Sequence, residues 1–190
     1  MARTVLVFGS CRRGLVTSLR LPRVTRTMTA VDSRVAVPSE DDLARLLQIG
    51  VVIEEYAEEK SARLLSDEVE DEEVRETLDE ALTESDEHRR RLLSLVREVG
   101  EDVDEERVES LVRESVESNV PSPDDPDEAL RHQLESERLA GSYYDSVIET
   151  CRASTRIDDA TVGRIVETLE EIRDDEYEDA EKIQKELTKT

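Results

Sequence analysis

Six polar residues occupy positions where the helical pattern of this sequence calls for apolar side chains. They are Glu54, Ser85, His88, Glu137, Glu176 and Asp179. A charged side chain on a buried helix face is costly unless another group compensates it. Carboxylates and an imidazole are also donors that suit Mn²⁺ and Fe²⁺. We therefore take these six positions as the candidates for chemistry and consider a shared metal site.

Four stretches of the chain must position these residues. The clearest is 162–187, where apolar residues follow a seven-residue repeat. Two central positions of that repeat hold Glu176 and Asp179 instead. The other three stretches are 43–64, 74–99 and 130–151, and each apolar seam is likewise interrupted near its middle. Four packed helices would bring these interruptions to one level. Carboxylate-bridged bundles use that arrangement, with one Glu from each of two helices and an i, i+3 pair from each of the others.

The chain resembles the ferritin-like, rubrerythrin-type superfamily over residues 40–189. The pattern Glu137-x-x-Ala140-x-x-x-Tyr144 is similar to the third helix of that superfamily, and Glu54-x-x-Ala57 is similar to the first. The resemblance implies an all-α, ferritin-like antiparallel four-helix bundle. It further implies a long crossover, carrying a short helix, between the second and third bundle helices.

The second and fourth stretches depart from the superfamily pattern, which has Glu-x-x-His in both. This chain has Ser85-x-x-His88 and Glu176-x-x-Asp179, so Ser85 replaces one bridging carboxylate and Asp179 replaces one His. The ligands that the resemblance implies are Glu54, His88, Glu137, Glu176 and Asp179. It implies iron or manganese as the cofactor and redox chemistry such as peroxide reduction or ferroxidation. Because the sequence has no Cys-x-x-Cys pair, electrons would come from a partner protein. A homo-oligomer is a further expectation.

A second hypothesis needs no metal. Charged residues make up 39 % of the chain, so an acidic residue in a helix is weak support for a ligand. His88 could pair with a carboxylate across the bundle, and hydrogen bonds could close the whole polar layer. The protein would then be a non-catalytic helical interaction or scaffold protein.

The helix boundaries follow from caps and breakers. We predict helices over 40–66, 68–99, 102–118, 126–153 and 158–188. Gly100 should stop the second helix, because glycine readily takes the left-handed conformation that ends helices. Asp125-Pro126-Asp127-Glu128 is a typical helix start, with a capping side chain followed by proline at the first position.

Residues 1–38 differ from the rest of the chain. They hold seven of the 26 basic residues and one of the 49 acidic residues, which leaves 19 basic against 48 acidic residues and a net charge of −29 in 39–190. We predict that 1–38 is a disordered basic segment, with Met28 as an alternative start. The acidic remainder disfavours nucleic-acid binding. No apolar run approaches the length of a membrane span, and two cysteines make no disulfide framework, so we expect a cytoplasmic protein.

The charge balance predicts a protein adapted to high salt. Carboxylates on one small bundle repel each other, and salt screens that repulsion because the Debye length falls from about 30 Å at 0.01 M to about 3 Å at 1 M. Helicity and melting temperature should therefore rise from dilute buffer to molar KCl, as followed by circular dichroism. An unchanged melting temperature would contradict the halophilic interpretation.

Overall fold

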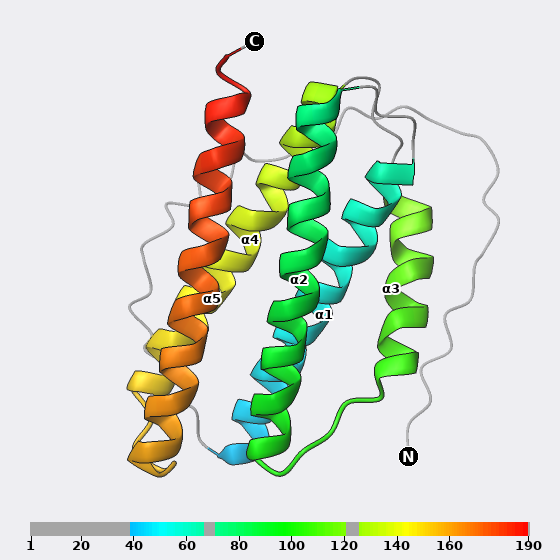
Figure 1. Ribbon diagram of the computed structural model, residues 1–190. Coiled ribbons are helices and arrows are strands. Elements are labelled where there is room, and N and C mark those ends of the chain that lie inside the picture. The colour runs from blue at the N-terminus through cyan, green and yellow to red at the C-terminus, as the bar shows by residue number, and fades with distance from the viewer. Residues whose placement is uncertain (1–38, 67–70, 121–125, 190) are drawn as a thin grey trace, which may run out of the picture. The chain divides into compact units, whose positions relative to one another are not determined.

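The computed structural model describes residues 39–66, 71–120 and 126–189. In these ranges the protein is all-α, with five helices and no strand (Figure 1). They are α1 (Glu40–Ser66), α2 (Glu72–Glu98), α3 (Glu105–Asn119), α4 (Pro126–Arg152) and α5 (Asp159–Glu186). None of these helices combines the length and the apolar character that crossing a bilayer requires. Every described residue belongs to one compact unit. The predicted basic segment 1–38 lies outside the described residues.

Aspartate side chains cap three of the helices. Asp71 accepts hydrogen bonds from the backbone N–H groups of Glu73 and Val74, which satisfies donors that have no partner inside the first turn of α2. Asp104 and Asp158 do the same for α3 and α5. The predicted second helix began at residue 68, whereas α2 begins at Glu72 after the Asp71 cap. Gly100 ends α2 with φ at +86°, as predicted.

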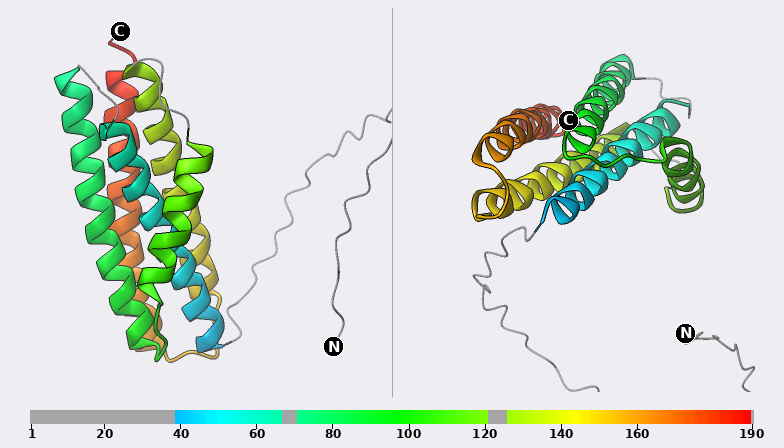
Figure 2. Two further views of the ribbon diagram at one scale, coloured as in Figure 1. Left: turned by 90° about the vertical axis from the view of Figure 1, so that its right-hand side faces the viewer. Right: turned by 90° about the horizontal axis from the view of Figure 1, so that it is seen from below.

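The helices pack as two hairpins, α1 with α2 and α4 with α5, each pair running in opposite directions (Figures 1 and 2). The hairpins meet where α1 contacts α4 and where α2 contacts α4 and α5. A close approach joins α4 to α5, since a Cβ on Gly141 would lie 2.8 Å from the Tyr177 ring. Outside this set, α3 packs against α1 through a small apolar cluster of Val112, Val116 and Val120.

The core consists of two apolar clusters separated by buried polar side chains. One cluster contains Leu43 and Leu47 of α1 together with Ile172 of α5, and the other contains Leu64 of α1 and Ile183 of α5. In each of these helices, and in α2 and α4, the residues between the two clusters include buried polar ones. The sequence predicted this polar interruption of each seam. We call these side chains the polar layer, and they are Glu54, Ser61, Ser85, His88, Gln133, Glu137 and Glu176.

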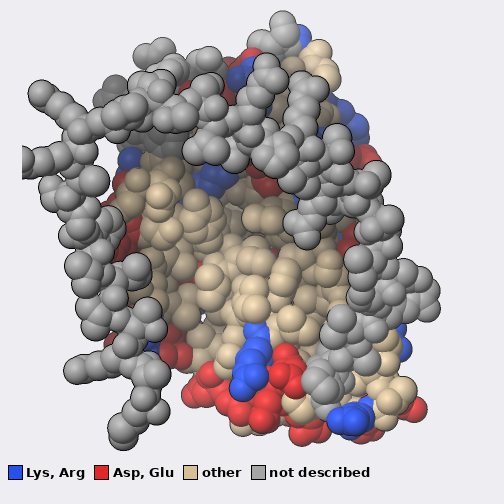
Figure 3. All heavy atoms as spheres, turned by 180° about the vertical axis from the view of Figure 1, so that it is seen from behind, with Lys and Arg blue, Asp and Glu red and all other residues tan. Residues whose placement is uncertain are grey.

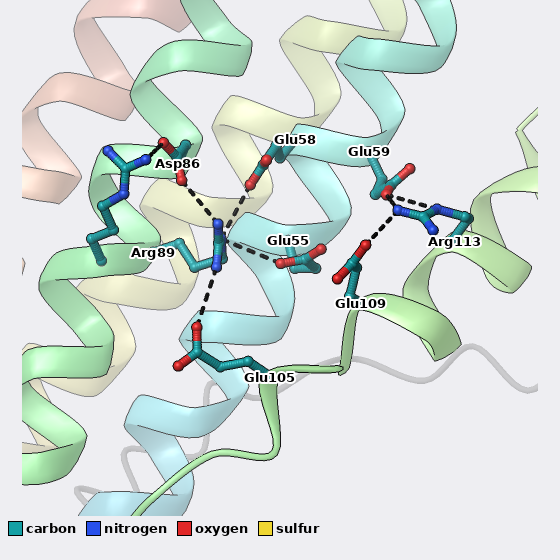
Figure 4. A network of polar contacts seen from close by, with 9 residues as sticks. Glu55, Glu58, Glu59, Asp86, Arg89, Glu105, Glu109 and Arg113 are labelled. Carbon is teal, nitrogen blue, oxygen red and sulfur yellow. Dashed lines mark hydrogen bonds and ion pairs between the residues drawn. The ribbon is translucent and has the colours of Figure 1, made fainter. Parts of the chain in front are cut away.

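A network of ion pairs joins α1, α2 and α3 on the outer side of the hairpin (Figure 4). The Arg89 guanidinium of α2 lies 3.2 Å from Glu55 and 3.1 Å from Glu58 of α1, and 3.7 Å from Glu105 of α3. Glu55 is buried, with its carboxylate paired to Arg89. Burial raises the pKa of Glu55, and the Arg89 charge opposes that rise.

Candidate metal centre

The candidate site is the part of the polar layer where α1, α2 and α5 converge. Glu54, His88 and Glu176 each direct one possible ligand atom to a common point, and these atoms all lie within 4.8 Å of one another. His88 Nδ1 lies 3.0 Å from Glu176 Oε1 and 3.9 Å from Glu54 Oε2. All three side chains are buried. The structure therefore brings together three of the five ligands that the sequence predicted.

The two carboxylate oxygens of Glu54 differ in their hydrogen bonds. The Tyr144 hydroxyl of α4 donates a hydrogen bond to Glu54 Oε1. Glu54 Oε2 is buried and has no hydrogen-bond partner among the described residues, the sole such side-chain atom in that part of the chain. A buried carboxylate oxygen without a partner is costly. This oxygen is also the one that faces His88.

Burial favours the protonated form of the carboxyl groups in the layer. Burial raises the pKa of Glu54 to about 8, against the usual 4.5. Burial and the Glu54 charge raise the pKa of Glu176, and burial also raises the pKa of Glu137. A hydrogen bond joins Glu176 and Glu137, and it raises the pKa of Glu176 while it opposes the rise at Glu137. The layer thus carries less negative charge than its composition suggests.

His88 is suited to donate a lone pair into the group. Burial lowers its pKa, which favours the neutral ring. Its Nε2 lies 3.4 Å from Asp175 Oδ2 on the partly exposed side, while Nδ1 faces Glu176. A neutral ring with its proton on Nε2 would donate to Asp175 and present the Nδ1 lone pair to a cation. Carboxylates orient metal-binding histidines in this way.

Glu137 and Asp179 lie beside the group rather than in it. Gln133 donates a hydrogen bond to Glu137, which is also hydrogen-bonded to Glu176. Asp179 accepts from Lys182 at 2.7 Å and shares a hydrogen bond with Glu84 of α2. The structure does not place Asp179 with the three converging residues.

Glu84 is the residue that the predicted ligand set left out. Burial, followed by the hydrogen bond and charge of Asp179, raises its pKa to about 8. It lies next to Ser85 and four residues, about one helical turn, before His88. Ser85 itself is buried in the polar layer.

Comparisons with known proteins identify no relative of this chain. No protein-family model, curated protein or solved structure matches it. The ferritin-like resemblance therefore depends on the residues described above, and the function must be argued from the site.

Proposed function

We propose that this protein is a ferritin-like antiparallel four-helix bundle with an incomplete carboxylate and histidine metal site. Glu54, His88 and Glu176 would hold one iron or manganese ion, with Glu137 as an adjoining carboxylate. The observation that supports this best is Glu54 Oε2, a buried oxygen without a partner that lies 3.9 Å from His88 Nδ1, in a group where Glu176 also offers a ligand atom.

The donor set fits Fe²⁺ or Mn²⁺. Carboxylate oxygens and one imidazole nitrogen are hard or borderline donors, and the polar layer contains no thiolate that would favour a softer ion. A divalent cation would displace protons from Glu54 and Glu176 and would give Glu54 Oε2 its missing partner. It would also offset the free-energy cost of burying several negative charges. Without a cation, protonation of the carboxylates lowers that cost.

A second ion would have weaker support. Ser85 stands where a bridging carboxylate would be needed, and a hydroxyl is a poor ligand for iron or manganese. Glu84 and Asp179 would supply the nearest alternative carboxylates, together with Glu137. We therefore propose one well-held ion and a defective second position.

The chain's own residues would position the ion and keep water away from it. Tyr144 fixes one oxygen of Glu54, and Asp175 orients His88. The apolar clusters on either side close the layer off along the helices. A bound iron or manganese ion would supply redox chemistry such as peroxide reduction or ferroxidation, with electrons from a partner protein.

A metal-free scaffold is the second candidate, and the hydrogen bonds of the layer favour it. Glu176 is hydrogen-bonded to Glu137, Gln133 donates to Glu137, and Ser61 donates to Gln133 at 3.0 Å. With Tyr144 on Glu54, these bonds satisfy most of the buried polar atoms without an ion. In this case the bundle would serve only to bind other proteins.

Metal analysis of the full chain, purified in high salt without chelator, tests the proposal. We expect about one iron or manganese ion per chain, with the bound amount falling at least about tenfold in Glu176→Gln, because glutamine keeps the shape but loses the charge. Glu87→Gln is the matched control, since Glu87 is exposed on α2 beside His88. Equal metal in the wild type and in Glu176→Gln would exclude the site, and consistently metal-free protein that takes up no added metal would favour the scaffold.

A further inference from the structure

A cavity of about 410 Å³ lies on the other side of α1 and α4 from the polar layer. Val52, Ile53 and Tyr56 of α1 line it, together with Leu139 of α4 and Val120 at the end of α3. Figure 3 views the side on which α1 and α4 lie, and uncharged residues gather across the middle of that face. The volume lies within the range of small-molecule sites, roughly 300–1,000 Å³.

This otherwise mostly apolar cavity is lined by one acidic residue, Glu135, and by one lysine, Lys60. Lys60 is 6 % exposed, which is unusual for lysine. Its Nζ donates hydrogen bonds to the backbone oxygen of His132 and to Ser136 Oγ. Both acceptors are neutral, and no carboxylate of the described residues lies within the 4.0 Å of an ion pair.

The ammonium group of Lys60 is therefore buried without a counter-charge in contact. Burial lowers its pKa to about 8, while Glu135 and Glu137 of α4 act on it from a longer distance in the opposite direction. At pH 7 the charged form still predominates. An ammonium has three N–H donors, and the two protein acceptors leave one for a ligand.

We propose that this cavity binds an apolar molecule carrying a single carboxylate, of the fatty-acid class, with its carboxylate at Lys60 and its chain along the apolar wall. A carboxylate supplies the missing counter-charge, and Val52, Ile53 and Leu139 supply the surface that an alkyl chain would cover. Val52 and Leu139 are 42 % and 65 % exposed, so the chain can extend outward over apolar surface. A multiply charged ligand fits poorly, because one ammonium balances one charge and the protein carries a net charge of −23.

The proposal is independent of the metal site. Val52, Ile53, Tyr56 and Lys60 lie on the face of α1 that bounds the cavity, whereas Glu54 belongs to the polar layer. Ligand binding at Lys60 can therefore be measured whether or not metal is bound.

Isothermal titration calorimetry of the full chain at pH 7 with decanoate and decan-1-ol tests the proposal. The wild type should bind decanoate on the order of ten- to a hundredfold more tightly than the alcohol, the usual gain from a charge-assisted hydrogen bond. Lys60→Met keeps a similar length without charge, and it should lose that preference while it still binds the alcohol. Lys185→Met, at an exposed lysine of α5, should behave like the wild type.

A second pair of variants keeps the test decisive if Lys60→Met fails to fold. Val52→Glu places a carboxylate at the mouth of the cavity and should weaken decanoate at least about tenfold, whereas Ile49→Glu, at an exposed apolar residue of α1 outside the lining, should not. Equal affinity for acid and alcohol in the wild type would overturn the proposal. The proposal would also be overturned if the protein formed a dimer that Val52→Glu dissociates but decanoate does not dissociate. A second copy of the chain would then occupy this face.

Discussion

Raising the pH from 5 to 8 should lower the melting temperature of the metal-free protein. The pKa of Glu54 is about 8 in the folded state and 4.5 when it is exposed. Below pH 4.5 both states hold the proton, and above it the unfolded state releases the proton while the folded state keeps it. The stability from this group is thus lost as the pH rises through the folded pKa. Because one pKa unit corresponds to about 1.4 kcal/mol, Glu54 alone accounts for a loss on the order of a few kcal/mol.

Burial also shifts the pKa of other groups in the layer. The raised pKa values of Glu137 and Glu176 add to the loss. His88 opposes it, because its pKa is lowered by burial, so the folded state gains stability as the pH rises from the folded pKa up to 6.5, where the gain is complete. Because three carboxyl groups act in one direction and one imidazole in the other, we expect the free energy of unfolding to fall as the pH rises.

Bound metal should reverse this trend. A cation competes with protons for the same oxygens, so the stabilisation by Mn²⁺ or Fe²⁺ should increase with pH. Thermal unfolding followed by circular dichroism, at constant high salt with either EDTA or excess Mn²⁺, would measure both slopes. Glu54→Gln mimics the protonated side chain and should flatten both, whereas Glu87→Gln should leave them unchanged. A melting temperature with the same pH dependence in EDTA and in Mn²⁺ would contradict the metal site.

The substitution Ser85→Glu should have opposite effects in a metal-binding and a metal-free bundle. Ser85 is buried in the polar layer, three residues before His88 on the same seam. If the site binds metal, the new carboxylate completes the second position. Iron or manganese content should then rise toward two ions, with little loss of stability in the loaded protein.

In a metal-free bundle, Ser85→Glu adds one more carboxylate to a layer in which Glu54, Glu137 and Glu176 already have raised pKa values. An unpaired buried charge costs several kcal/mol, on the order of 3–5. Metal content and denaturant unfolding, measured on the same preparations, would separate the two cases. Ser94→Glu, at an exposed serine of α2, controls for the added charge. A Ser85→Glu protein that unfolds and that no added metal restores would contradict the proposed second metal position.

The sequence by itself determined the all-α class and the approximate bounds of the helices. It also located the polar layer. Spacing along one helix decides which side chains share a face, and capping decides where a helix begins. Glu54, His88 and Glu176 could be named in advance because each breaks an apolar repeat of its own helix. This information is local, so one sequence suffices to read it.

Only the tertiary structure decided which polar side chains meet. Asp179 breaks the same repeat as Glu176, yet it contacts Lys182 and Glu84 instead of the converging group. Lys60 looks like a surface lysine in the sequence, and only the packing of α1 on α3 and α4 buries it. Such contacts depend on how neighbouring helices are rotated and displaced along each other, which no periodicity within a single helix specifies.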